Sequence, residues 1–305
     1  MAVAADTPYV SPRRHPVELV GGWEVGLLVF MVLLYLVGLY VNSGFFGRVD
    51  ALAAVLRDSA RYGVMAVGMT FVIVNKDLDL SVGSTFGLVA TVFSIFFAPP
   101  GYYDASIWVA LFAAILVGLG VGLLNGVLVT YLGVPAFIAT LTMLFIGRGF
   151  VLGLSGGKNI SYIEKAKENE WFFSLGETNT WGFNNQIVIL ALFAVVGMFL
   201  LSKTRVGYET YATGGNELAA SYSGIPTRWV RIRAYLFSAL CATVAGLMSV
   251  AQTKGTSSQE GFGAELIVIA AVIVGGASIL GGRGRVIGSV LGAIMVVLKI
   301  GRAHV

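Results

Sequence analysis

The chain alternates long apolar stretches with short polar ones. Most of the stretches approach the length of about 20 residues that an α-helix needs to cross a bilayer, and shorter ones suit helices that are broken or buried in protein. The nine stretches lie at 22–41, 62–74, 82–98, 107–131, 135–154, 187–201, 234–252, 264–280 and from 286 onward. We expect an all-α polytopic membrane protein with one transmembrane domain over 22–298, because no segment between the stretches is long enough for a soluble domain.

The composition favours the same class. Hydrophobic residues make up 57% of the chain and charged residues only 12%, whereas roughly a quarter of the residues in a soluble domain are charged. The mean hydropathy is +0.84. The short alternating segments of a membrane β-barrel are absent, so the predicted spans are helices.

Several kinds of chemistry are excluded. The single cysteine, Cys241, lies in an apolar run, so the chain has neither a disulfide framework nor a thiol metal site. His15 and His304 lie near opposite ends and form no metal-binding pair. We therefore expect no metal. The net charge of +4 is concentrated in a few loops, which is how membrane proteins encode topology, so it does not indicate nucleic-acid binding.

Loop charges predict the orientation. The 202–233 loop holds five basic and two acidic residues, and the 155–186 loop holds three basic and four acidic residues. By the positive-inside rule the first loop is cytoplasmic and the second external. Counting spans from a cytoplasmic tail at 1–21, which holds Arg13 and Arg14, gives the same side for each loop, and Arg283 and Arg285 then also fall inside. The first apolar stretch is too long for a signal-peptide core, so we expect an uncleaved span and a cytoplasmic N-terminus.

Two glycine series recur every four residues within predicted spans. They are Gly118, Gly122 and Gly126, and Gly284, Gly288 and Gly292. At 3.6 residues per turn each series lies on one helix face. Close helix packing is the favoured interpretation, and a sliding or gap-lining role in transport is the alternative.

The segment 75–84 places three charges between two short apolar runs. Asp79 and Ser81 are good N-caps for a helix beginning near Val82, which favours a structural role. Ionisable groups at membrane depth are costly, however, and the flanking runs resemble the broken helices of transporters. A candidate translocation route therefore comprises Asp77, Asp79, Ser81 and Asn125.

Other polar groups within the spans carry weaker signals. Thr140, Thr142, Asn125 and Gln252 are interpreted as interhelical hydrogen-bonding groups, with contact to a polyol as the alternative. Arg148 lies near the outer end of its span, where snorkelling to the membrane interface is the default expectation and an anionic partner is the alternative.

The basic 202–233 loop contains a short helix-forming stretch. Asn216 is a plausible N-cap, and the stretch runs from Glu217 to Gly224. It is entered through Gly214 and Gly215, where we expect a flexible backbone. Because an isolated helical turn is unstable, the stretch is expected to rest against the bundle and present its other face to a cytoplasmic partner, although a plain solvated loop is an equal alternative. No phosphate-binding loop ending in Gly-Lys-Ser/Thr is present, so the chain itself is not expected to hydrolyse ATP.

Four groups of residues resemble the permeases of ATP-driven ABC importers of the ribose and xylose type. They are 68–73 with 79–84, 135–141, 214–220 with 223–225, and 275–284 with Gly288. In this family the Gly-Asn-Glu-x-Ala-Ala…Ser-Gly-Ile loop looks like the coupling helix that docks into an ATPase. The resemblance gives that role to Gly215, Asn216, Glu217, Ala219, Ala220 and Gly224.

The resemblance also implies partners and a location. It implies a separate ATPase subunit that binds ATP, a periplasmic or extracellular sugar-binding protein, and a second permease copy in the bilayer. The chain would then be a multi-pass protein of the bacterial plasma (inner) membrane, with no cofactor of its own. The expected function is import of a monosaccharide such as ribose or xylose, or of a related polyol.

The chain departs from the family pattern at two places. Asn75 and Lys76 stand where the family commonly has glycines, and Leu78 replaces its isoleucine, which leaves the substrate open. The family also has about ten spans, so we expect nine of them here, with a truncated C-terminus and a non-native tail at 299–305.

Two other functions stay open from the sequence. One is a permease for branched-chain amino acids, which shares the general architecture. The other is a secondary transporter driven by an ion gradient, in which Asp77 and Asp79 would be the coupling carboxylates. A membrane scaffold without transport activity is the most remote alternative.

Overall fold

The computed structural model describes residues 21–99, 101–178 and 184–300. The predicted cytoplasmic tail and the predicted non-native tail therefore lie almost wholly outside the described residues. Within them the regular elements are helices and two short strands, joined by turns and loops. The helices that follow the apolar stretches are α1 (Gly22–Val41), α3 (Val49–Val74), α4 (Val82–Phe97), α5 (Ile107–Thr130), α6 (Ala136–Ser155), α9 (Asn185–Lys203), α12 (Thr227–Thr253), α13 (Ala264–Val274) and α14 (Val286–Ile300).

Each of the nine predicted apolar stretches forms a helix, which confirms the all-α polytopic architecture. Among the described residues, α1, α5, α6, α9 and α12 are long and apolar enough to cross a membrane, and α4, α13 and α14 are shorter apolar helices. The α3 helix has 26 residues and begins 13 residues before the predicted stretch. Charged residues in its first half, such as Arg57 and Asp58, end the apolar run without ending the helix.

Two other boundaries also differ from the prediction. The α12 helix begins at Thr227, seven residues early, because its first turns are basic and partly exposed. The α13 helix ends at Val274, six residues early. Gly276, with a φ of 91°, turns the chain out of the helix there.

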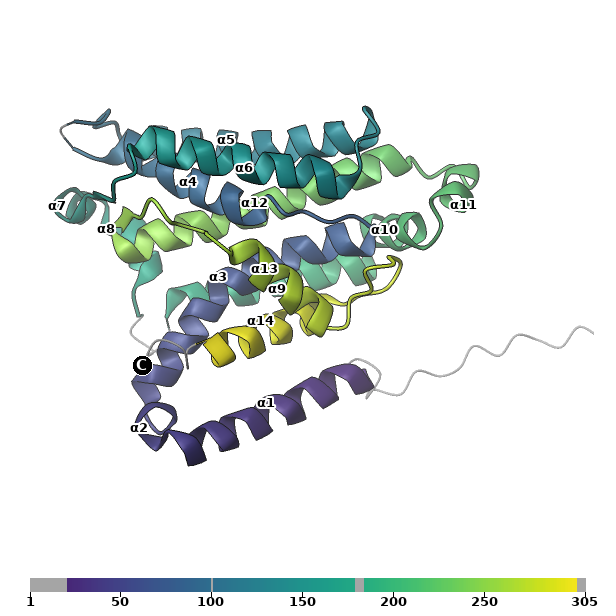
Figure 1. Ribbon diagram of the computed structural model, residues 1–305, viewed down its shortest axis with the longest axis horizontal. Coiled ribbons are helices and arrows are strands. Elements are labelled where there is room, and N and C mark those ends of the chain that lie inside the picture. The colour runs from purple at the N-terminus through teal and green to yellow at the C-terminus, as the bar shows by residue number, and fades with distance from the viewer. Residues whose placement is uncertain (1–20, 100, 179–183, 301–305) are drawn as a thin grey trace, which may run out of the picture.

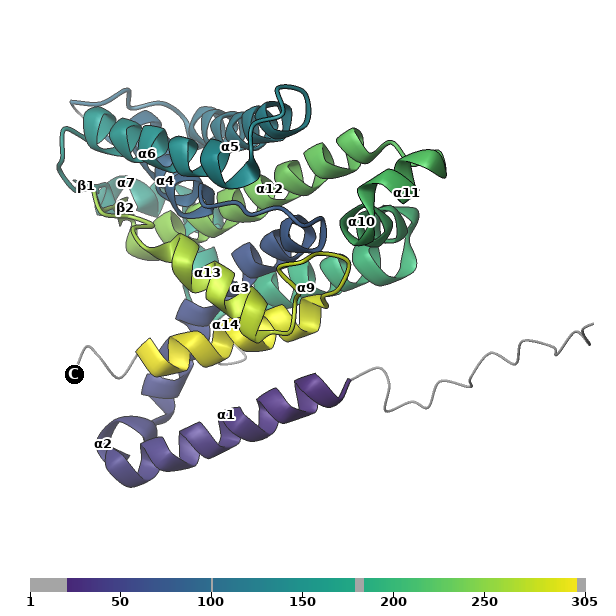
Figure 2. The same ribbon diagram turned by 45° about the vertical axis from the view of Figure 1, so that its right-hand side comes forward.

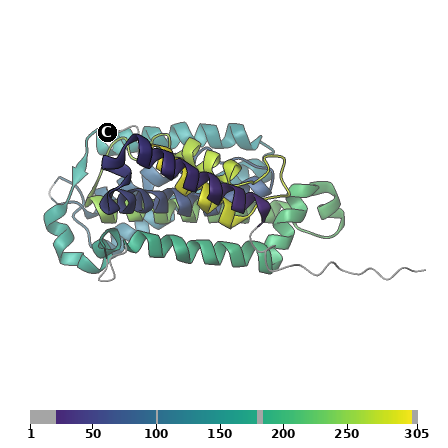
Figure 3. The ribbon, with the colours of Figure 1, turned by 90° about the horizontal axis from the view of Figure 1, so that it is seen from below.

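The α12 helix forms the centre of the molecule. It packs along α3, α4 and α5, and most of its length is buried (Figure 1). The α1 helix lies at the periphery, beneath the bundle, where it contacts α14 (Figure 3). Trp23 of α1 donates from Nε1 to the carbonyl oxygen of Val274 at 2.9 Å, which ties α1 to the end of α13.

Both glycine series lie at helix crossings. A Cβ atom on Gly118 would lie 2.0 Å from Thr243 Oγ1, and one on Gly122 would lie 2.5 Å from Ala239 Cβ. The first series therefore packs directly on α12. The second series is only partly helical, because Gly284 precedes α14 and the prediction that it shares a helix face with Gly288 and Gly292 is wrong. A Cβ atom on Gly288 would lie 2.0 Å from the carbonyl oxygen of Gly275, and one on Gly292 would lie 2.0 Å from that of Ala271, so these two glycines lie against the end of α13.

The end of the bundle that is predicted to be external carries small elements and an aromatic cluster. Strands β1 (Ile160–Ser161) and β2 (Gly255–Thr256) pair antiparallel there, next to α7 (Ile163–Ala166), η2 (Lys167–Asn169), α8 (Glu170–Phe173) and η3 (Ser174–Gly176) (Figure 2). The rings of Phe93, Phe97, Tyr162, Phe172 and Phe173 pack together beneath them. Burying these rings fixes the loop onto the bundle.

The opposite end holds the basic loop, most of which is helical. This loop forms α10 (Arg205–Gly215), α11 (Glu217–Tyr222) and the first turns of α12. The remaining short helix, α2 (Ser43–Phe46), lies between α1 and α3 in the chain. The expected flexible entry through Gly214 and Gly215 is wrong, because both residues belong to α10. A Cβ atom on Gly214 would lie 1.7 Å from the carbonyl oxygen of Val74, so this glycine is held in a close contact.

Candidate functional site

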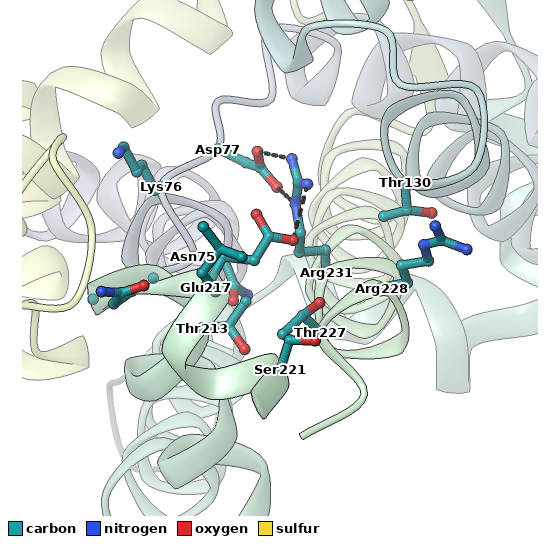
Figure 4. Close-up of a pocket in the computed structure, with 14 residues that line it drawn as sticks. Asn75, Lys76, Asp77, Thr130, Thr213, Glu217, Ser221, Thr227, Arg228 and Arg231 are labelled. Atoms are coloured by element: carbon teal, nitrogen blue, oxygen red, sulfur yellow. Dashed lines mark hydrogen bonds and ion pairs between the residues drawn. The ribbon is translucent and has the colours of Figure 1, made fainter. Parts of the chain in front are cut away.

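An open cavity of about 820 Å³ lies at the end of the bundle that carries α10 and α11 (Figure 4). Its walls come from the α3–α4 turn, the α10–α11 corner, the start of α12 and the end of α5. Three charged side chains from three of these elements converge in it, namely Asp77, Glu217 and Arg231. This convergence makes the cavity the candidate functional site.

Arg231 joins the three elements. Its Nε and Nη2 atoms donate to the two carboxylate oxygens of Asp77 at 2.8 and 2.7 Å, and its Nη1 atom lies 3.6 Å from Glu217 Oε1. The Asp77 side chain is only 5% exposed, whereas that of Glu217 is 51% exposed. A bidentate guanidinium–carboxylate pair is geometrically specific, so α12 and the α3–α4 turn are firmly joined. Glu217 on α11 is held more loosely.

The α3–α4 turn has a defined helix ending. The amides of Lys76 and Asp77 donate to the carbonyls of Ile73 and Val72 at 2.9 and 3.1 Å, which is the paired pattern of a Schellman motif. This pattern needs a left-handed residue, and Lys76 supplies it with a φ of 69°. The turn therefore directs Asp77 toward α12.

The end of α13 has the same geometry. The amides of Gly276 and Ala277 donate to the carbonyls of Ile273 and Val272 at 2.9 and 3.1 Å. Both helices end in Val-Ile-Val, so the α3–α4 and α13–α14 turns are a structural repeat. The two turns also touch, because the Gly282 amide donates to the Val74 carbonyl oxygen at 2.8 Å.

Three of the four residues of the candidate translocation route form one buried network. Asp79 accepts hydrogen bonds from Ser81 Oγ at 2.6 Å, from the Ser81 amide at 3.0 Å and from Ser238 Oγ at 3.1 Å. Asn125 donates from Nδ2 to Ser81 Oγ at 2.8 Å. Asp77 lies outside this network, in the cavity with Arg231. Ser81 occupies the N-cap position of α4, but its side chain forms no capping bond.

Three residues of this region, all on α12, were not among the candidates that the sequence indicated. Arg231, Tyr235 and Ser238 follow the i, i+4, i+7 spacing of one helix face, and they face the α3–α4 turn. This spacing of polar residues near the start of a predicted span was the sequence signal that could have identified them. Among the described residues, the buried Tyr235 hydroxyl and Asn125 Oδ1 have no hydrogen-bond partner.

The α11 helix has a capped start and an exposed face. Asn216 Oδ1 accepts the Ala219 amide at 3.0 Å, which confirms the predicted N-cap. Ala220 is 5% exposed and rests against the bundle, whereas Leu218 and Tyr222 are 67% and 87% exposed. The helix therefore lies on the bundle and presents apolar side chains outward.

A buried carboxylate fixes α10. Glu209 Oε1 accepts from Arg205 Nε at 2.7 Å, and its other oxygen accepts from Arg233 of α12. Burial raises the pKa of the Glu209 carboxyl, but the hydrogen bonds from Arg233 and Arg205 outweigh burial and leave the pKa below its ordinary value. The carboxylate thus stays charged and anchors α10 to α12.

The remaining polar groups of the spans differ in whether their hydrogen bonds join separate elements. Thr140 donates to the Leu78 carbonyl at 3.2 Å and Gln252 Oε1 accepts from Gln186 at 3.2 Å, so both connect separate elements, whereas Thr142 bonds only within its own helix. Arg148 does not snorkel. It donates to the Glu260 carbonyl at 2.6 Å and stacks on a ring of the β2–α13 loop.

These features define a class. The chain is a multi-pass helical membrane protein with a small capped helix at one end of its bundle and ionic contacts that connect this helix to two spans. Residues 51–300 match the family model described as the permease component of the branched-chain amino acid transport system. The chain belongs to this family of membrane permeases.

Individual relatives agree with the family. The chain is 33% identical to the ribose import permease protein RbsC of Escherichia coli K12 over 291 residues, which cover 95% of this chain and 88% of that protein. It is 36% identical to the autoinducer 2 import system permease protein LsrC of Yersinia enterocolitica over 278 residues, 88% of this chain and 72% of that protein. No solved structure gives a significant match.

Proposed function

We propose that this chain is the membrane-spanning subunit of an ATP-driven importer for a monosaccharide. The membership of the permease family and the similarity to a ribose import permease support the substrate class. In this proposal a separate ATPase binds and hydrolyses ATP, an external binding protein delivers the sugar, and a second permease copy completes the pathway. The chain lies in the bacterial inner membrane with a cytoplasmic N-terminus and needs no cofactor.

The exposed face of α11 is the observation that carries this proposal. A six-residue helix has little stability by itself, yet this one is capped, seated on Ala220 and presents Leu218 and Tyr222 outward. Exposed apolar side chains at such a place fit a protein partner. The proposed partner is the ATPase, with Gly215, Asn216, Glu217, Ala219, Ala220 and Gly224 shaping the docking helix.

The ionic contacts supply a transmission route. When the ATPase pulls on α11, force reaches Glu217, then Arg231 on α12 and Asp77 in the α3–α4 turn. Since the turn carries Asp79 and its network with Asn125, the movement reaches the middle of the bundle. Alternating access then follows from a tilt of α12 against α3.

Two alternatives are less well supported. A gradient-driven carrier needs carboxylates that exchange an ion, whereas Asp77 is held in a bidentate pair by Arg231 and Asp79 accepts three hydrogen bonds. Import of branched-chain amino acids has only the general name of the family in its favour, whereas the two relatives described are named for ribose and autoinducer 2.

The docking role is tested with Leu218→Lys. We expect this variant to insert normally but to lose co-purification of the ATPase and ATP-dependent uptake of labelled ribose. The matched control is Ile163→Lys, a 54% exposed residue of α7 at the opposite end of the bundle, which should retain both. Undiminished uptake by Leu218→Lys would contradict the docking role.

A further inference from the structure

A second polar cavity lies in the half of the bundle opposite α11. It has a volume of about 250 Å³ and is bounded by α3, by Phe86 of α4 and by the segment between β2 and α13. Its polar side chains include Arg61, Tyr62, Gln259 and Glu260. By the loop charges this half is external, so the cavity lies on the side from which an imported molecule enters the permease.

Two polar groups of this cavity, Arg61 and Glu260, are held in place by hydrogen bonds before any ligand enters. Arg61 donates to Asp58 Oδ1 at 2.9 Å and to Ser249 Oγ at 3.1 Å. Ser249 in turn donates to Glu260 Oε1 at 2.6 Å. A guanidinium and a carboxylate are thus held in one chain of hydrogen bonds that joins α3, α12 and the β2–α13 loop. Such preorganisation lowers the ordering cost of binding.

The loop that closes the cavity is seated tightly on α4. A Cβ atom on Gly87 would lie 2.2 Å from the Glu260 carbonyl oxygen, and one on Gly83 would lie 2.8 Å from that of Gly261. Arg148 of α6 donates to the Glu260 carbonyl oxygen from the other side. The cavity wall therefore belongs to the packed bundle and is not a loosely attached loop.

The lining matches an uncharged polyol. The Arg61 guanidinium donates, the Glu260 carboxylate accepts and the Gln259 amide does both, while the rings of Tyr62 and Phe86 offer apolar surface to C–H groups. A few placed polar groups beside aromatic walls are the usual composition of a small-molecule site.

The charges around this cavity balance. Around the cavity and its supporting contacts stand three cations, Arg57, Arg61 and Arg148, and three anions, Asp58, Glu260 and Glu265. The Arg61 guanidinium is already paired with Asp58. An uncharged ligand leaves this balance undisturbed, whereas a substrate carboxylate would add a negative charge without a partner.

We propose that this cavity, formed around Arg61, Tyr62, Gln259 and Glu260, is the external entry site at which the permease binds the sugar. The assignment rests on the proposed function and adds a location and a binding mode to it. Ser249 and Arg231 both belong to α12. Tyr62 belongs to α3, and the α3–α4 turn directly follows this helix. The entry site and the cavity beside α11 therefore share two helices. Occupancy of one site is thus connected mechanically to the other.

The experiment depends on the burial of Cys241, the single cysteine of the chain, which leaves an introduced thiol as the one that reacts. Gln259→Cys introduces an accessible thiol at the cavity, and the full-length permease in right-side-out spheroplasts is treated with a membrane-impermeant maleimide. We expect D-ribose or D-xylose to slow labelling roughly threefold when the sugar stands at about twice its dissociation constant, and L-leucine to have no effect. Lys158→Cys, exposed at the same end but outside the cavity, is the control and should label at one rate throughout.

Uptake of labelled ribose in intact cells that carry the same variant, where the external binding protein is retained, separates the possible failures. If ribose is taken up but no sugar slows labelling at Gln259→Cys, the entry site is wrong and the proposed function stands. If ribose is not taken up, and only leucine or nothing slows labelling, both proposals are wrong.

A second variant tests the same site independently, in case Gln259→Cys does not fold. Glu260→Gln keeps the size of the side chain and an acceptor for Ser249 but removes the charge. We expect the KM for ribose uptake to rise roughly tenfold, with an unchanged maximal rate and unchanged α11-dependent ATPase binding. An unchanged KM, or a fall in the maximal rate alone, would overturn the binding role of Glu260.

Discussion

A single left-handed residue, Lys76, decides how the α3–α4 turn is built. Its φ of 69° closes the helix ending that directs Asp77 toward Arg231. The equivalent position at the end of α13 is Gly276, with a φ of 91°. The two turns therefore adopt one conformation with different residues, and only the lysine has a Cβ atom that opposes it.

Lys76→Gly should therefore stabilise the permease. A non-glycine residue in the left-handed region costs about 1–2 kcal/mol, and we expect a large part of that to be recovered as a higher midpoint of thermal unfolding in detergent. Lys76→Ala is the control, because it removes the ammonium group but keeps the Cβ atom. Equal stabilisation by both variants would mean that charge, and not backbone conformation, is responsible.

The sequence indicated that position 76 is unusual, but it did not indicate the backbone conformation there. Lys76 stands where the family commonly has glycine, and that departure is visible in the sequence. Its backbone conformation is not, because a lysine side chain carries no sign of the φ angle that the folded chain imposes on it. The conformation becomes evident once the amides of Lys76 and Asp77 are seen to bond back to α3.

Glu209 gives a pH-dependent prediction. Its pKa is lowered in the folded chain by Arg233 and Arg205, so its stabilising contribution is present above the unfolded value of about 4.3 and is lost as the pH falls through the lower folded value. Glu209→Gln should lose about 1.5–3 kcal/mol at neutral pH, the usual contribution of a hydrogen bond to a charged group. The difference between wild type and variant in thermal midpoint should shrink on acidification below pH ~4, and a constant difference would contradict this account.

At the level of elements, hydropathy located each long apolar helix of the described residues but not every helix end. Apolar runs report which segments can face lipid or the bundle interior, so the charged first half of α3 and the basic first turns of α12 were omitted. The α10 helix was missed entirely, because it has no apolar run and its stability comes from contacts between Glu209 and arginines both near and distant in sequence. Such long-range pairs are not visible in a local pattern.

The glycine series on α5 offers a direct test of element packing. Gly122 faces Ala239 of α12, whereas a Cβ atom on Gly120 of the same helix would meet nothing within 4 Å. We expect Gly122→Ala to destabilise the permease by about 1–3 kcal/mol through overpacking, measured as the midpoint of thermal unfolding. Gly120→Ala should be neutral or slightly stabilising, because alanine is the better helix former. Equal effects at both positions would show that the α5–α12 contact is not tight.

At the level of the whole molecule, the candidate route residues divide between two environments that no spacing rule could separate. Asp77 and Asp79 are two residues apart, yet Asp77 faces the cavity beside α11 and Asp79 faces the interior network. Their partners, Arg231 and Ser238, are more than 150 positions away. The family resemblance predicted a coupling role for α11, and only the folded chain connects that helix to the spans.

That connection predicts a charge-exchange result. Asp77→Arg and Arg231→Asp, each alone, should lower ribose uptake by roughly tenfold or more, because each leaves a charge without its partner. The double variant restores an ion pair and should recover much of the lost uptake. Expression in the membrane is measured in parallel, and a double variant that is no better than either single one would contradict the transmission route.

The backbone hydrogen bond between the two repeated turns has a further consequence. The Gly282 amide reaches across to the Val74 carbonyl, so its proton can exchange with deuterated solvent only when the α3–α4 and α13–α14 turns part. The exchange rate of this one amide thus reports how often the α3–α4 and α13–α14 turns separate. A cycle that tilts α12 against α3 should speed it up during ATP turnover, without any label or substitution in the chain.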